Sequence, residues 1–168
     1  MQFSYTLVVL IHILAAIIWL GGMFFIAIVM VPVLRRLEPP QKRIEVLSAT
    51  ATRFRAISWI AILVLLITGV LNAINHGVTM QKISTGDFFS SYFEKILAVK
   101  LMLVFIMLVL SAIHDFVLGP RLVELQSSCI YNLDSSQRLK KNRKYVSWLA
   151  RINALLGILV VACAVMLS

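Results

Sequence analysis

Four polar side chains in or at the ends of apolar stretches are candidates for chemistry in this 168-residue chain. They are three histidines, His12, His76 and His114, and one lysine, Lys100. Imidazole nitrogens bind transition metals and haem iron, and an ammonium group can bind a haem propionate or a quinone oxygen. Such groups are costly in a lipid environment. We therefore expect His12 and Lys100, which lie inside long apolar runs, to face protein, a cavity or a ligand.

Each candidate also has an ordinary structural explanation. His12 could be hydrogen-bonded to a carbonyl or an asparagine of a neighbouring helix, and His76 could be a solvated histidine at a helix end. His114 and Asp115 could be a polar pair at a helix C-terminus, where the helix dipole favours a cation. Neighbouring helical residues point about 100° apart, so Asp115 need not contact His114. Lys100 could extend its long stem and place its charge at the membrane interface.

The elements that must position these residues are four apolar blocks. The chain is 61% hydrophobic, with a mean hydropathy of +0.95, whereas soluble domains are about 45–50% apolar. The blocks cover about residues 4–34, 56–76, 93–118 and 146–167, and at about 1.5 Å per residue each can cross a hydrocarbon layer of about 30 Å. The pattern predicts an all-α integral membrane protein, a bundle of four transmembrane helices forming one domain over residues 1–168, with a short amphipathic segment, residues 42–55, before the second span.

The distribution of charge predicts an orientation. The formal net charge is +9, and the segments 35–55 and 119–145 each hold six lysines or arginines. The positive-inside rule places both segments in the cytoplasm and both termini in the periplasm of a bacterial inner membrane. The first block lacks a basic N-terminal region and ends in arginines, so we expect it to be a retained helix rather than a signal peptide. The charge gives no indication of a nucleic-acid partner.

Each predicted helix carries its few polar or small residues on one face, and we expect these faces to meet inside the bundle because lipid-facing polar groups are costly. No phosphate-binding loop, dinucleotide turn, CxxC or HExxH motif is present, so the sequence leaves open whether the protein is an enzyme. The four faces consist of His12, Ala16, Trp19, Met23 and Met30; Thr68, Asn72, Asn75 and His76; Lys100, Leu103, Met107, Ser111 and His114; and Asn153, Gly157, Val160 and Ala164.

Several of these residues occur in an order that resembles a known family. His12 with residues 19–24 resembles the first helix of the copper-resistance CopD family, and Arg53-Phe54 before Thr68-Gly69 resembles the second. Lys100-Leu101, His114 and residues 120–122 resemble the third. The resemblance covers most of the first three helices and is weaker in the fourth. It implies passage of copper across the inner membrane.

A more distant resemblance is to membrane protoporphyrinogen oxidases of the HemJ type, which implies haem b. The 14 residues between Lys100 and His114 depart from that pattern and favour the CopD family. In the copper hypothesis, His12 and His76 form an outer entry site with Met80 or Met102, because imidazoles and thioethers suit Cu(I). A lower station would combine His114 with Met23 or Met30, although such methionines are more often filling residues of a helix core.

Two further hypotheses remain open. In the first, the protein is a haem-b redox protein or a quinone-linked electron carrier, with His12 or His114 as axial ligands and Lys100 at a propionate; Trp19 completes this candidate cofactor-binding set. In the second, the protein binds no metal and is an accessory subunit of a membrane complex, or a homo-oligomer. It would then pack through glycines such as Gly21, Gly22 and Gly157.

Overall fold

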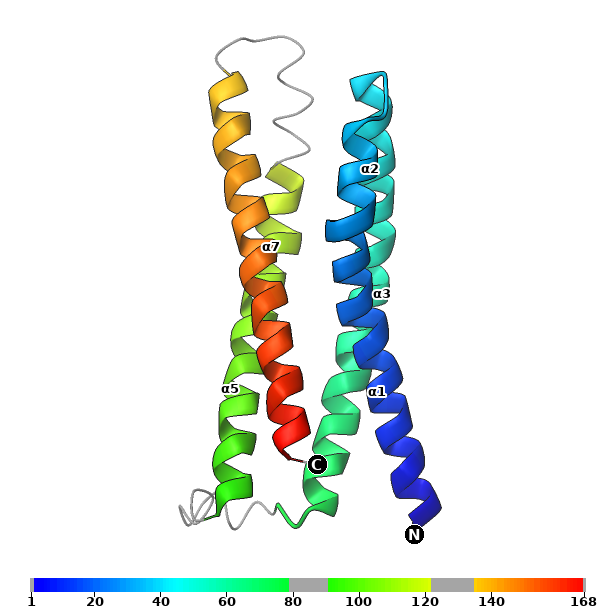
Figure 1. Ribbon diagram of the computed structural model, residues 1–168, viewed down its shortest axis with the longest axis vertical. Coiled ribbons are helices and arrows are strands. Elements are labelled where there is room, and N and C mark those ends of the chain that lie inside the picture. The colour runs from blue at the N-terminus through cyan, green and yellow to red at the C-terminus, as the bar shows by residue number, and fades with distance from the viewer. Residues whose placement is uncertain (1, 79–90, 122–134, 168) are drawn as a thin grey trace. The chain divides into compact units, whose positions relative to one another are not determined.

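The computed structural model describes residues 2–78, 91–121 and 135–167, and all elements in these ranges are helical (Figure 1). Four helices are long and apolar enough to cross a membrane: Phe3–Arg35, Gln41–Asn75, Tyr92–Arg121 and Lys144–Met166. These findings confirm the predicted all-α membrane fold with four spans. The chain divides into two compact units, Met1–Phe88 and Phe89–Ser168, which we call hairpin 1 and hairpin 2 and describe separately.

Hairpin 1 begins with one long helical segment that contains a wide turn. The segment comprises α1 (Gln2–Phe25), the π-helical turn η1 (Ile26–Met30) and α2 (Val31–Arg35). Pro32 has no N–H to donate, and its ring crowds the carbonyl four residues earlier, which is that of Ile28. Ile28 lies within η1, so the wider π turn accommodates the proline without ending the helix.

The second half of hairpin 1 is α3 (Pro40–Asn75), a single helix of 36 residues. The predicted amphipathic segment and the predicted second span are therefore parts of one unbroken helix. The reason is visible in the sequence, since no proline occurs between residues 41 and 75. At about 1.5 Å per residue the helix is about 54 Å long, much longer than a hydrocarbon layer.

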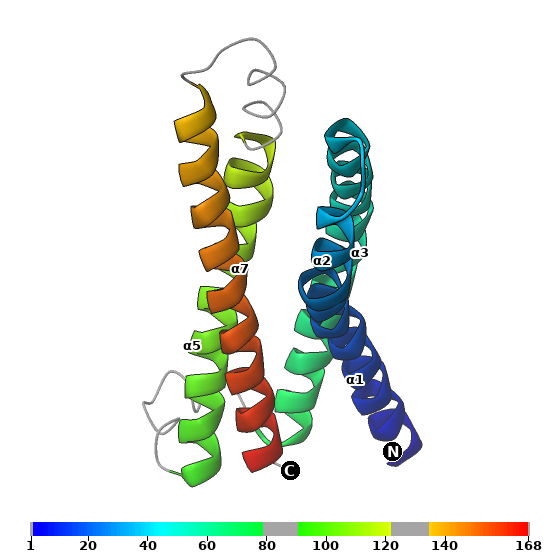
Figure 2. The ribbon, with the colours of Figure 1, turned by 45° about the horizontal axis from the view of Figure 1, so that its top comes forward.

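The two halves of hairpin 1 run side by side in opposite directions (Figures 1 and 2). Ala15 and Trp19 of α1 are buried, as are Ala61 and Ile62 of α3. Gly22 faces α3 as well, because a Cβ atom added at this glycine would overlap the ring of Phe54. The expected role of a glycine in close packing is thus found at Gly22, where it admits an aromatic side chain. Gly21, by contrast, is exposed.

Hairpin 2 has the same sequence of elements. It comprises α5 (Tyr92–Ala112), the π-helical turn η3 (Ile113–Leu118) and α7 (Ser135–Met166). A proline again follows the π turn, Pro120, and the carbonyl that it crowds is that of Phe116 inside η3. The helix α7 begins at Ser135, well before the predicted start at residue 146. The four helices also pack as two described pairs, α1 with α3 and α5 with α7.

The start of α5 is fixed by a capping box that the sequence analysis did not use. The Glu94 backbone N–H donates to Ser91 Oγ over 3.2 Å, and the Ser91 N–H donates to Glu94 Oε2 over 3.0 Å. The pattern Ser-x-x-Glu before an apolar run signals this arrangement. It explains how Glu94 can be buried at the start of an apolar helix.

The prediction of a single domain and the prediction that all four polar faces meet inside the bundle both stay predictions.

Candidate functional site

His12 is held against α3 by a hydrogen bond. Its Nδ1 atom lies 2.7 Å from Thr68 Oγ1, and Thr68 in turn donates its hydroxyl to the carbonyl oxygen of Val64 over 2.6 Å. Thr68 is buried and His12 is partly buried. The imidazole also lies over Gly69, where an added Cβ atom would be 3.6 Å from His12 Cε1. The side chain of His12 therefore points at the partner helix of hairpin 1, as its position in an apolar run predicts.

Trp19 lies two turns beyond His12 on the same face of α1, and only 7% of its surface is exposed. The buried residue Ala15 lies between them. This face agrees with the predicted stripe through His12 and Trp19. The proposed contact of Trp19 with a cofactor stays a prediction.

His76 occupies the far end of α3. Its Nδ1–H donates to the carbonyl oxygen of Asn72 over 2.9 Å, and its ring lies 6.0 Å from the ring of Tyr5 between centroids. The side chain is exposed. His76 and His12 are thus anchored at different turns of α3, one at Asn72 and the other at Thr68. Whether both reach one copper ion stays a prediction, and Met80 lies outside the described residues.

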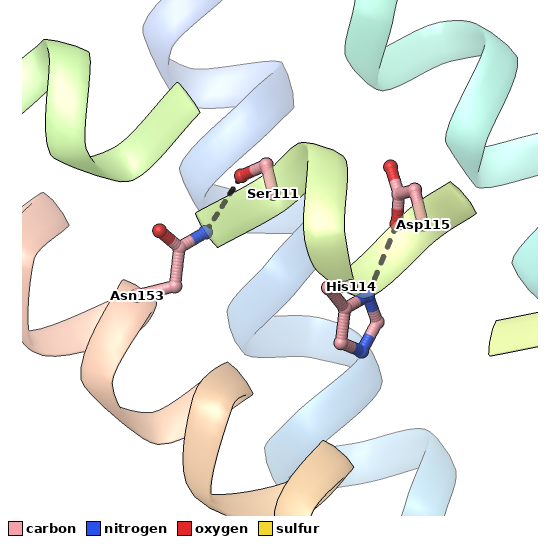
Figure 3. Close-up of polar contacts among 4 residues, drawn as sticks. All are labelled: Ser111, His114, Asp115 and Asn153. Carbon is pink, nitrogen blue, oxygen red and sulfur yellow. Dashed lines mark hydrogen bonds and ion pairs between the residues drawn. The ribbon is translucent and has the colours of Figure 1, made fainter. Parts of the chain in front are cut away.

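In hairpin 2 the π turn η3 holds a histidine and a carboxylate in contact. His114 Nδ1 lies 3.0 Å from Asp115 Oδ1, and the two side chains are 36% and 21% exposed (Figure 3). The helical geometry of adjacent residues did not require this contact. Figure 3 shows that the Nδ1 side of the imidazole faces the carboxylate, so that the two side chains are in contact. A histidine whose Nδ1–H is held by a carboxylate is a common arrangement in metal sites.

One turn before His114, a second polar contact joins α5 to α7. Asn153 Nδ2 donates to Ser111 Oγ over 2.9 Å, and both side chains are buried (Figure 3). Both residues belong to predicted polar faces, but the sequence analysis did not identify them as a pair. The helical periodicity places them on inward faces, and only the packing of α7 on α5 sets which residues meet.

The remaining candidates, Lys100 and Met102, also lie on α5. Lys100 is partly buried. Met102 is 59% exposed. His12 and His76 belong to hairpin 1 and Met102 to hairpin 2, so their predicted common site stays a prediction. Within the described parts of the chain, no group of three or more His, Cys, Asp or Glu residues is arranged to hold a metal ion.

Comparison with known proteins identifies the family. The sequence pattern of copper resistance protein D matches residues 48–167, which is more than half of the chain. The match includes most of α3 and all of α5 and α7, whereas the resemblance noted from the sequence began in α1 and was weaker in the last helix. A protein of Aquifex aeolicus (strain VF5), described only as uncharacterized, is 26% identical over 162 residues, covering 96% of this chain and 93% of its own length. No solved structure matches the chain significantly. The chain therefore belongs to the copper resistance protein D family and is a multi-pass membrane protein connected with copper resistance.

Proposed function

We propose that this protein binds Cu(I) within the membrane and passes it across the bacterial inner membrane, with both termini on the periplasmic side. Membership of the copper resistance protein D family supports copper as the cargo. The basic segments 35–55 and 119–145 support the orientation through the positive-inside rule. Imidazoles and thioethers are the side chains that suit Cu(I) in an apolar environment.

The observation that carries the proposal is the placement of His12. It lies ten residues after the start of α1, about 15 Å along the helix and inside the apolar span Phe3–Arg35. A hydrogen bond of 2.7 Å to Thr68 holds the imidazole against α3 rather than toward lipid. An ordered histidine at this depth marks a functional site in a membrane protein by default.

The other two histidines, one in each hairpin, supply further candidate stations. His76 is exposed beside Tyr5 at the end of hairpin 1 that we assign to the periplasm, where Met80 or Met102 could complete an entry site. His114, paired with Asp115, lies in η3, just before the basic segment 119–145, and is the second proposed station, for which the sequence offers Met23 or Met30 as the thioether ligand. Several weak sites in sequence permit an ion both to enter and to leave.

Binding of Cu(I) to the purified protein in lipid nanodiscs tests the proposal. The protein is titrated anaerobically against a chromogenic Cu(I) chelator, and uptake of copper is followed in proteoliposomes. His12→Ala should weaken binding at least about tenfold, because it removes a primary ligand. Ile13→Ala is the matched control, since Ile13 is the next residue and is 49% exposed; it should bind copper as the wild type does.

Two outcomes would contradict the proposal. A wild-type protein that binds no Cu(I) would leave the membrane-scaffold hypothesis, and His12→Ala with unchanged affinity would remove His12 from the site. A visible spectrum of the same preparation tests the haem hypothesis, because a Soret band that shifts on reduction would replace copper with haem b. The family is described by copper resistance, and we therefore expect no such band.

A further inference from the structure

We infer that Thr68 is a positioning residue that fixes His12 in the tautomer with its proton on Nδ1 and its metal-binding lone pair on Nε2. This inference deepens the proposed function, because it names the atom that would bind Cu(I) and the group that selects it. It rests on two hydrogen bonds and a count of protons.

Thr68 has a single hydroxyl proton, and that proton is already used. Thr68 Oγ1 donates to the carbonyl oxygen of Val64 over 2.6 Å, with the carbonyl oxygen of Leu65 at 3.4 Å. A carbonyl oxygen can only accept. The 2.7 Å contact with His12 must therefore have Thr68 Oγ1 as the acceptor and His12 Nδ1–H as the donor.

The proton on Nδ1 determines the chemistry of the other ring nitrogen. A neutral imidazole carries one N–H, so a proton on Nδ1 leaves the lone pair on Nε2. Metal-binding histidines are commonly oriented in this way by a hydrogen bond from the nitrogen that does not bind the metal. Thr68 is only 6% exposed, so the orientation is set in a site shielded from solvent.

The same ring atom is engaged in the other two histidines of the chain. His76 Nδ1 contacts the carbonyl oxygen of Asn72, and His114 Nδ1 contacts the carboxylate of Asp115. These partners accept without assistance. A threonine hydroxyl can donate or accept, and Thr68 becomes a fixed acceptor only because the Val64 carbonyl takes its proton. The tautomer of His12 therefore depends on a side chain that a single substitution can remove.

Solid-state or solution NMR of the full-length protein labelled with ¹⁵N-histidine tests the inference without copper. The chain contains three histidines, and His12→Gln assigns the ring signals of His12. The wild type should show His12 protonated on Nδ1 and unprotonated on Nε2. Thr68→Val, which has nearly the same shape but no hydroxyl, should change the His12 ring signals toward a mixture of tautomers, and Thr68→Ser should restore them.

The chain provides a matched control for the loss of a threonine hydroxyl. Thr52 is also on α3 and also donates to the carbonyl four residues earlier, that of Ser48, over 2.9 Å, but it is exposed. Thr52→Val should leave the His12 signals unchanged. In the Cu(I) titration, Thr68→Val should weaken binding about 10- to 100-fold, the usual effect of removing the group that orients a metal-binding histidine, while Thr52→Val and Thr68→Ser should bind as the wild type does.

The outcomes separate this inference from the proposed function. A wild-type His12 protonated on Nε2 would overturn the inference, and this measurement does not depend on the folding of a variant. His12 signals that Thr68→Val leaves unchanged would also overturn it. Failure of Thr68→Ser to restore the signals would also overturn it. A protein that shows the expected tautomer but binds no Cu(I) would contradict the proposed function and leave the role of Thr68 intact.

Discussion

Hairpin 1 and hairpin 2 are built on the same plan, but they use their interiors differently. In each, a long first helix passes through a π turn and a proline before the chain returns in a second helix. Pro120 follows Pro32 by 88 residues, and the same offset separates Met107 from Trp19 and Lys100 from His12. Trp19 and Met107 are both buried, so the corresponding positions have corresponding roles in packing.

The difference lies in the polar groups. Hairpin 1 places an imidazole in the first third of its span Phe3–Arg35 and ties it to the partner helix through Thr68. Hairpin 2 has an ammonium group, Lys100, at the corresponding position, and its interhelical hydrogen bond, between Ser111 and Asn153, lies near the π turn. The comparison indicates that one packing scheme can hold an imidazole side chain in one hairpin and a lysine side chain in the other. The packing of each hairpin can be tested by measuring the stability of single-residue variants.

The largest loss of stability is expected at the buried position that the two hairpins share, which is Trp19 in hairpin 1 and Met107 in hairpin 2. Met107 is completely buried at 0% exposure, and Met107→Ala should lower the free energy of unfolding by about 2–5 kcal/mol, because it leaves a cavity. Unfolding in mixed micelles with increasing SDS measures this change. Met102→Ala is the control on the same helix, at 59% exposure.

Met102→Ala should change the stability by less than about 0.5 kcal/mol. If Met102 is a copper ligand, the same variant should nevertheless weaken Cu(I) binding. Equal losses of stability for the two methionine variants would contradict the assignment of Met107 to the core of hairpin 2.

A smaller effect is expected at the contact between Gly22 and Phe54 in hairpin 1. Gly22→Ala places a methyl group against the Phe54 ring, and overpacking of this kind costs about 1–3 kcal/mol. Gly21→Ala adds the same methyl group where no heavy atom lies within 4 Å, so it should not destabilise the protein. The difference between the two variants in SDS unfolding measures the contact, and equal stabilities would mean that Phe54 moves aside at little cost.

The smallest effect concerns the polar contact of hairpin 2. A double-mutant cycle with Ser111→Ala and Asn153→Ala should give a coupling energy of about 0.6 kcal/mol, and no more than about 1.7, as is typical of hydrogen bonds between membrane helices. The single variants and the double variant are compared by the same unfolding measurement. A coupling energy near zero would show that burial of these side chains, rather than their hydrogen bond, fixes α7 on α5.

The sequence predicted the class of fold, because apolar length is a local property of the chain, whereas Asn75 and His76 of one predicted inward face are exposed. It did not predict the continuity of α3, since basic residues such as Arg53 suggested an interfacial segment, and the absence of proline permits a continuous helix without requiring one. The early start of α7 was missed for a similar reason. Polar residues can form a helix beyond the membrane without any change in periodicity.

The site was predicted in part. The sequence indicated that His12 should face protein, but not that Thr68 would meet it, because the register between α1 and α3 depends on how Trp19 and Gly22 pack. The contact of His114 with Asp115 was considered unnecessary, since side-chain rotation within a helical turn cannot be read from spacing. The Ser91–Glu94 capping box was the exception, because its Ser-x-x-Glu signal was present in the sequence and was overlooked.

The unbroken length of α3 has a mechanical consequence. Arg53 and Thr68 lie on one stiff rod, about 22 Å apart along its axis, and the chain offers no joint between them. Twisting or tilting of the charged end is therefore transmitted directly to the hydroxyl that faces His12. A partner that binds α3 near Arg53 can therefore displace Thr68 and, through it, the imidazole of His12.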